Sequence, residues 1–157
     1  MRALALVCLL ASLAAAAGDD GIHADAVTIV TARKSDWRIV SPSAAAPGAD
    51  WASRELQRYL HQMSGCELPI GGRPGSKPVF VIGLRAKLSR ADRALLPPPA
   101  PGYDGYALVV RPAAGKTPAR IVIAGDNGRG VIYGVYDLLE RLALISTLSG
   151  KANRDAI

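Results

Sequence analysis

The feature that most restricts the fold is an amphipathic helix pattern that follows Asp50 and stops at Gly65. We expect Asp50 to cap its start, and Gly65 is the residue type that commonly follows a helix end. Its apolar residues recur at helical spacing along one side: Ala52, Leu56, Tyr59, Leu60 and Met63. A stripe of this kind has to be buried against a second layer of structure.

Short runs rich in β-branched residues supply that second layer. The strands are predicted at residues 27–31, 37–41, 79–83, 105–111 and 119–124. Short polar or turn-rich segments separate the first two strands and the last two, so both pairs are predicted to form hairpins. A second amphipathic helix is predicted from Arg129 to about Leu142, and a short helix over residues 89–96.

The predicted order is β-β-α-β-α-β-β-α, with strands joined both by hairpins and across helices. This order favours an α+β fold in which helices pack mainly on one face of a mixed β-sheet. A purely parallel, doubly wound sheet would not contain the hairpins.

The N-terminus predicts export. Met1-Arg2 is positively charged, residues 3–17 carry no charge, and a run of four alanines precedes Gly18. This arrangement is typical of a secretory signal peptide over residues 1–17; a buried N-terminal helix is the alternative. The apolar stretch is shorter than the roughly 20 residues that span a membrane. We expect a cleaved leader, a linker over residues 18–26, a secreted or periplasmic protein, and no membrane span after cleavage.

Cysteine content and charge exclude other classes. Cleavage would remove Cys8 and leave Cys66 alone, so no intramolecular disulfide is expected, and Cys66 is predicted to act as a small buried apolar residue. The formal net charge of +6 is spread along the chain. Its densest basic run, residues 85–93, contains no aromatic residue and is predicted to be a solvated face, so nucleic-acid binding is not expected.

One segment has the form of an anion-binding loop. In residues 121–130 a predicted strand runs into three glycines and then a helix, the setting in which backbone amides approach a phosphate. Too few residues follow for the rest of a nucleotide-binding domain, so no cofactor is expected. The simplest interpretation is a tight turn whose glycines supply positive φ and close packing. The alternative is a contact loop for another domain or a sugar, with Asp126, Asn127 and Arg129 as binding residues.

The sequence shows no catalytic or metal-binding pattern. His23 and His61 are the only histidines, and there is no paired cysteine motif or H-E-x-x-H motif, so no metal site is predicted. There is no G-x-S-x-G nucleophile motif. The internal acidic residues cannot be placed opposite one another from sequence, so no catalytic residue is assigned.

Two regions together resemble a known family. Residues 52–65 are closed by Leu-Pro-Ile at 68–70, and an Asp-Gly-Tyr strand at 104–108 precedes the Ile-Val-Ile-Ala-Gly strand and the helix over 129–140. This pattern resembles the N-terminal domain of bacterial α-glucuronidases, which is related to the second domain of β-hexosaminidases. The resemblance covers residues 27–141 of this chain.

The resemblance implies an α+β domain over residues 27–142 that is a non-catalytic module of an exported glycoside hydrolase. Its partner would be a catalytic (β/α)8 barrel, which carries the acid and base and needs about 250 residues. Residues 143–157 depart from the family, because no Gly- and Trp-containing segment leads toward a barrel. We therefore expect an atypical tail, produced by truncation or a frame-shift, or a domain fragment.

Two other functions stay open. A free-standing exported module that binds a glycan or an envelope partner would need an exposed aromatic platform, for which the candidates are Trp37, Trp51, Tyr103 and Tyr106. An independent enzyme would need two acids that converge on the loop at residues 125–130.

Overall fold

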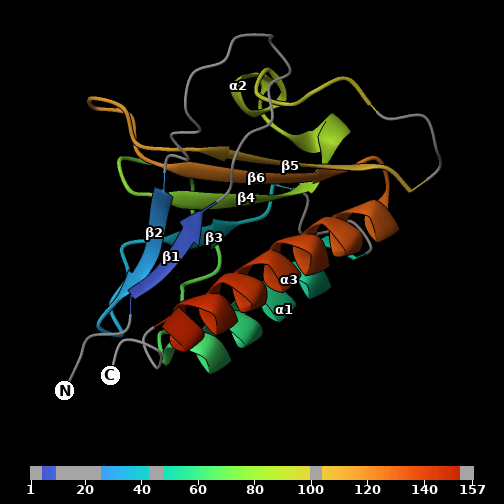
Figure 1. The fold of residues 1–157 in the computed structure, drawn as a ribbon. Helices are drawn as coiled ribbons and strands as arrows, with labels where there is room; N and C mark the ends of the chain where they lie inside the picture. The colour runs from blue at the N-terminus through green and yellow to red at the C-terminus, as the bar shows by residue number, and fades with distance from the viewer. Residues whose placement is uncertain (1–4, 10–25, 43–47, 100–103, 153–157) are drawn as a thin grey trace, which may run out of the picture.

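A four-stranded mixed sheet forms the centre of the domain (Figure 1). The computed structural model describes residues 5–9, 26–42, 48–99 and 104–152. The strand order is β3-β4-β6-β5, in which β3 (Arg38–Val40), β4 (Val79–Leu84) and β6 (Arg120–Gly125) are parallel. β5 (Tyr106–Arg111) runs antiparallel to β6, and the predicted hairpin between them is confirmed.

The long helices cover one face of this sheet. α1 (Ala49–Ser64) and α3 (Gly128–Ala152) lie side by side on that face, while the single turn η1 (Arg85–Lys87) and the short α2 (Arg90–Arg93) lie across the other (Figure 1). The predicted α+β fold, with helices mainly on one side of a mixed sheet, is therefore confirmed.

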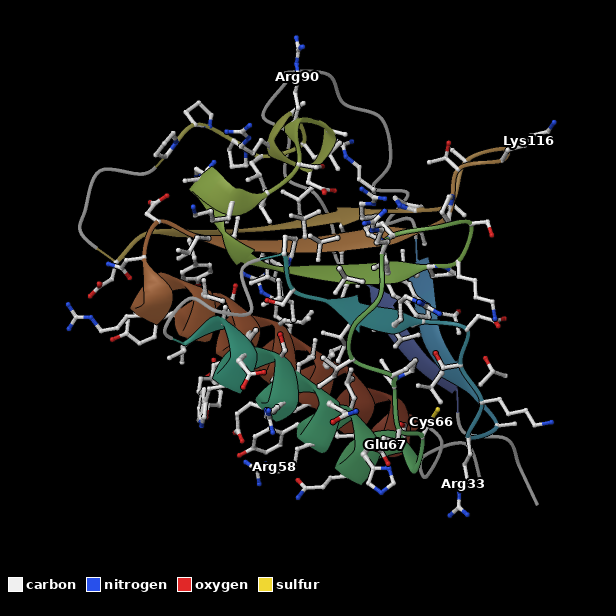
Figure 2. The ribbon with its side chains drawn as sticks, turned by 180° about the vertical axis from the view of Figure 1, so that it is seen from behind. Arg33, Arg58, Cys66, Glu67, Arg90 and Lys116 are labelled. Atoms are coloured by element: carbon white, nitrogen blue, oxygen red, sulfur yellow. The ribbon has the colours of Figure 1, made fainter. Side chains whose placement is uncertain are left out.

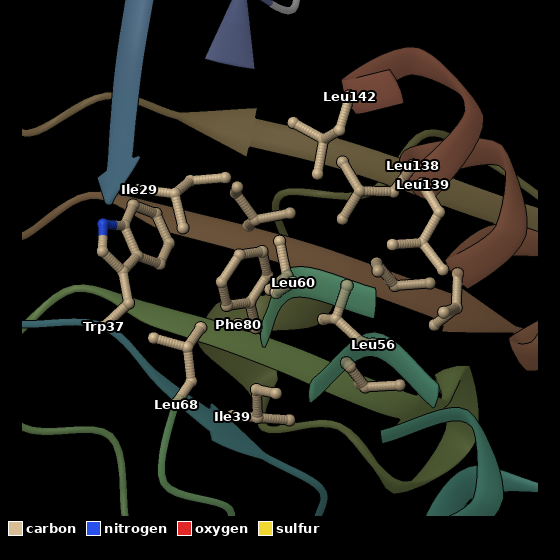
Figure 3. Packing of buried hydrophobic residues seen from close by; sticks show 14 of the residues in the cluster. Ile29, Trp37, Ile39, Leu56, Leu60, Leu68, Phe80, Leu138, Leu139 and Leu142 are labelled. Carbon is tan, nitrogen blue, oxygen red and sulfur yellow. The ribbon is translucent and has the colours of Figure 1, made fainter. Parts of the chain in front are cut away.

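The main core lies between the sheet and the two long helices (Figure 3). Leu56 and Leu60 of α1 and Leu138 of α3 belong to the same buried cluster as Phe80 of β4, whose ring centroid is 4.8 Å from that of Trp37. A smaller core under α2 joins Leu88, which precedes α2, to residues on the other face of the sheet strands: Val40, Val79, Val81, Val122 and Ala124. β4 and β6 are thus buried on both faces, which explains why they read as unbroken apolar runs.

The predicted hairpin between residues 27–31 and 37–41 is wrong. The chain does reverse after Thr31, but the Ser35 hydroxyl then donates to the Ile29 carbonyl oxygen at 2.6 Å and the Trp37 indole donates to the Thr28 carbonyl oxygen at 2.9 Å. Side chains therefore take the acceptors that a second strand would need. β3 pairs with β4 instead, and β2 (Ala26–Thr31) pairs antiparallel with β1 (Ala5–Leu9) in a separate sheet.

The helix ends differ in part from expectation. α1 ends at Gly65 as predicted, but its N-cap is Gly48, and Asp50 lies in the first turn where it pairs with Arg54 at 3.0 Å. α3 continues to Ala152, ten residues beyond the predicted end at Leu142 and into the expected tail. No proline or glycine lies between Leu142 and Gly150 to stop it. Among the described residues, no helix is long and apolar enough to cross a membrane.

Candidate functional site

The predicted contact loop lies where the parallel strands of the sheet end. Arg85 follows β4, the loop residues 126–129 follow β6, and Asp104 lies just before β5, which runs in the opposite direction. The fold therefore brings three segments that are distant in sequence to one edge of the sheet. In open α/β sheets this edge is also where ligands commonly bind.

At this edge the three predicted residues come together with two others that the sequence did not single out. The Arg85 guanidinium is 3.0 Å from the Asp126 carboxylate, and the Arg129 guanidinium is 3.2 Å from the Asp104 carboxylate. The Asn127 side-chain amide donates to the same Asp104 oxygen at 2.8 Å. We call these five residues the polar latch, because they tie β4, the start of β5, the end of β6 and α3 together. Asp104 belongs to the Asp-Gly-Tyr motif, and this motif is the sequence feature that could have marked Asp104 as a member of the site.

The polar latch already occupies the positions that an anion would use. The Asn127 side-chain oxygen accepts from the Gly130 amide at 2.9 Å, and so caps the N-terminus of α3. Each carboxylate of the latch faces a guanidinium, so the two positive and two negative charges balance. This geometry favours a structural role, and binding by Asp126, Asn127 and Arg129 stays a prediction.

The glycines of this loop are required by close packing. A β-carbon on Gly125 would lie 2.2 Å from the Val131 amide nitrogen, and one on Gly130 would lie 2.3 Å from the Gly105 carbonyl oxygen. Neither Gly125 nor Gly130 lies in the left-handed region, so the expected positive φ is wrong for both. The expected close packing is confirmed.

A second feature is a group of partly exposed aromatic side chains on the two long helices and on the adjoining strand β5. Trp51 is 45% exposed, Tyr133 is 48% exposed and Tyr106 is 38% exposed. The ring of Trp51 lies 5.9 Å from that of Tyr136, and Tyr106 lies against Gly134, so the group extends from α1 across α3 to β5. We call Trp51, Tyr106, Tyr133 and Tyr136 the aromatic band.

Charged groups border the aromatic band. The Tyr136 hydroxyl donates to Glu55 at 3.3 Å, and Arg58 donates twice to the same carboxylate, at 3.0 and 2.8 Å. These bonds from Arg58 lower the pKa of Glu55 below its usual value. Partial burial raises the pKa of Tyr136, and the neighbouring Glu55 carboxylate raises it further. Burial, together with the Asp137 carboxylate, likewise raises the pKa of Tyr106.

The structure separates the candidates for an aromatic platform. Trp37 is only 3% exposed and packs in the core (Figure 3), whereas Trp51 and Tyr106 are exposed as a platform requires. Tyr103 lies outside the described residues. Tyr133 and Tyr136 were not among the candidates that the sequence offered for a platform. The rings of Trp51 and Tyr136 are inclined by 56°, so they do not form a flat stacking surface.

No arrangement for catalysis or metal binding stands out in the part of the chain that the structure describes. Asp104 and Asp126 both lie in the polar latch, and an arginine neutralises each of them. Among the residues whose placement is described, no three His, Cys, Asp or Glu side chains are grouped to hold a metal ion. Cys66 is a half-buried thiol beside an open hollow of about 730 Å³, which Trp37 and Thr31 also line.

Comparison with known proteins agrees with the fold and with the family resemblance. The family model described as the N-terminus of glycosyl hydrolase family 67 matches residues 22–138. No curated protein matches the chain. Because the family match covers most of the 157 residues, the chain belongs to the glycosyl hydrolase family 67 N-terminal domain family.

Proposed function

We propose that this chain is the accessory domain of an exported family 67 glycoside hydrolase, and that the aromatic band docks it onto a catalytic (β/α)8 barrel. The exposure of the aromatic band is the observation that supports docking. The outer face of a helix layer is normally polar, whereas here two large rings, Trp51 of α1 and Tyr133 of α3, are each more than a third exposed, and Tyr106 of β5 beside α3 is exposed as well. Aromatic residues are enriched in protein interfaces, and charged residues border the apolar part.

The chemistry of hydrolysis is assigned to the barrel. Glycoside hydrolysis commonly uses two carboxyl groups that face each other across a substrate. Asp104 and Asp126 are the acids that meet near the sheet edge, and each is held by an arginine. An accessory domain needs no such pair. We therefore expect the chain alone to release no sugar from an α-glucuronide.

Export is supported by the sequence pattern of residues 1–17. The charged start, uncharged apolar stretch and small residues up to Ala17 are those that a signal peptidase recognises. We expect expression with the leader in a bacterial host to yield a secreted or periplasmic product whose mass corresponds to residues 18–157. A product that keeps the leader would refute this part of the proposal.

A free-standing glycan-binding module is the second candidate, because Trp51 is exposed as sugar-stacking rings are. The 56° inclination between Trp51 and Tyr136 disfavours it, since stacking on a sugar ring needs a flat face. Binding of glucurono-oligosaccharides to the isolated chain, lost in Trp51→Ala, would support this candidate over docking to a barrel.

Docking is tested with a family 67 catalytic chain from which its own N-terminal domain has been deleted. Added in excess, the present chain should form a complex with it by size-exclusion chromatography and raise its α-glucuronidase activity. Tyr133→Ala should weaken the complex at least about tenfold, because exposed aromatic anchors carry much of the binding energy of an interface.

Lys116→Ala is the matched control. Lys116 is also exposed, but it lies at the tip of the β5–β6 connection, on the other side of the sheet from Arg58 of α1 (Figure 2). This substitution should leave the complex unchanged. Absence of any complex, or equal effects of the two substitutions, would contradict docking through the aromatic band.

A further inference from the structure

We propose that the edge of β2 is a docking site for one strand of the catalytic partner, and that removal of the leader vacates it. This inference rests on the proposed export and the proposed partnership. β1 (Ala5–Leu9) pairs with this edge and lies wholly inside the predicted leader, residues 1–17. Cleavage would therefore take away a strand that is part of the folded domain.

The pairing between β1 and β2 is extensive. The register runs antiparallel from Ala5 opposite Thr31 to Leu9 opposite Ala26, with one irregularity between Leu6 and Val7. Loss of β1 would leave the backbone amides and carbonyls along this side of β2 without a ladder. An unpaired edge of this kind is a template for another strand.

The rest of β2 stays anchored without β1. Ile29 packs into the main core close to Trp37 (Figure 3), and the Trp37 indole donates to the Thr28 carbonyl oxygen at 2.9 Å. The amide and carbonyl groups of Thr31 and Lys34 bond each other at 2.9 Å in both directions. Core packing and bonds within the domain therefore hold β2 in place without β1.

The surroundings of β1 specify the occupant. α3 also contacts β1, so the vacated position lies between β2 and α3 and suits a single strand (Figure 1). A second complete copy that paired through its own β2 edge would bring its helix layer against α3. All five residues of β1 are apolar. The occupant is therefore an extended, apolar segment of about five residues that runs antiparallel to β2. The aromatic band lies near the start of α3 and β1 lies toward its other end (Figure 1), so a catalytic partner that covers the band has to extend along α3 to supply this segment.

The test follows amide hydrogen exchange along β2 in the full chain and in its processed form, residues 18–157. Exchange within residues 27–30 should be at least about tenfold faster after processing, while the amide of Thr31, which is bonded to Lys34, and the amides of β4 stay protected. A peptide that carries residues 3–10 with Cys8→Ser and added terminal lysines should restore the protection. The same peptide with Val7→Pro is the matched control, because proline cannot complete the ladder, and it should have no effect.

The full chain with Val7→Pro provides a second route that keeps the polypeptide intact. It too should lose protection in β2 and then bind the unmodified peptide. Retained protection of β2 in both the processed chain and this variant would overturn the proposal, as would a dimer in which β2 is protected. Global unfolding of both would also overturn it, because β1 would then be an integral strand.

The identity of the occupant is tested with the truncated catalytic chain. Complex formation that restores protection of β2 supports the proposal. A complex that forms while β2 exchanges freely refutes strand docking but leaves the proposed function standing. Peptide binding with no complex refutes the catalytic chain as partner, and an uncleaved leader in the exported product refutes the export on which the inference depends.

Discussion

The turn between β2 and β3 stores strain that a single substitution should release. Ala32 and Arg33 both lie in the left-handed region, with φ values of 50° and 63°. They are the central residues of a tight reversal that mutual hydrogen bonds between Thr31 and Lys34 close at 2.9 Å. Turns with two left-handed residues favour Asn-Gly, because a β-carbon costs roughly 1–2 kcal/mol in that region.

Ala32→Gly measures the free-energy cost of the β-carbon in the left-handed region. The Ala32 side chain is exposed, so its loss removes no core packing. Removing the β-carbon should recover about 1–2 kcal/mol, and the greater freedom of glycine in the unfolded chain should cost about 0.4–1 kcal/mol. The net effect is a stabilisation of roughly 0.5–1 kcal/mol. Arg33 is less suitable for this test, because its side chain lies against Gly65.

Ala113→Gly is the matched control. Ala113 is an exposed loop alanine that does not lie in the left-handed region, so the same exchange should destabilise by about 0.4–1 kcal/mol. Urea unfolding followed by circular dichroism should therefore give midpoints that shift in opposite directions from the unsubstituted chain, with unchanged slopes. Equal decreases for Ala32→Gly and Ala113→Gly would show that Ala32 is not strained.

Three further substitutions test other parts of the structure. Gly130→Ala should destabilise by about 1–3 kcal/mol in a thermal melt, because its β-carbon would meet backbone at 2.3 Å; an unchanged melting temperature would refute this packing. Arg120→Ala should cost about 3 kcal/mol in urea unfolding, because it leaves the 2%-exposed Asp92 carboxylate without its ion pair, whereas an effect as small as that of a surface substitution would refute this role. Glu55, whose pKa Arg58 lowers, should contribute stability above its unfolded pKa that is lost as the pH falls through the lower folded pKa. Glu55→Gln should therefore cost less than about 1 kcal/mol at neutral pH, given the exposure of Arg58, and nothing in strong acid; a cost that is constant with pH would contradict this.

Local patterns predicted the elements of this fold because each carries its own periodic signal. The stripe that contains Leu56 and Leu60 predicted α1, and the apolar runs at residues 79–83 and 119–124 predicted the strands β4 and β6. The sequence did not predict Gly48 as the N-cap of α1, because the requirement for glycine at this position comes from close packing against α3. A β-carbon there would lie 2.8 Å from the Gly128 carbonyl oxygen of α3.

Pairings between distant segments could not be predicted in the same way. The hairpin predicted after β2 does not form because the side chains of Ser35 and Trp37 donate to carbonyl oxygens of β2. The local sequence pattern does not show these bonds. The polar latch was found in part: Asp126 was a candidate, but its partner Arg85 lies 41 residues away, and only the parallel pairing of β4 with β6 brings them together. Nothing in the local sequence of either residue encodes that contact.

The distribution of satisfied and unsatisfied groups indicates the kind of partner that this domain binds. A site for a small ligand keeps convergent polar groups available in a concave pocket. At the sheet edge the opposite holds, because Asp104 and Asp126 are matched by arginines and Asn127 caps α3. The two most exposed large apolar groups, Trp51 and Tyr133, lie instead on the long helices, where burial against another protein would gain free energy. The polar residues thus tie the segments of the domain to one another and the exposed aromatic residues stay available, which is the arrangement expected if the domain supports a catalytic partner as proposed.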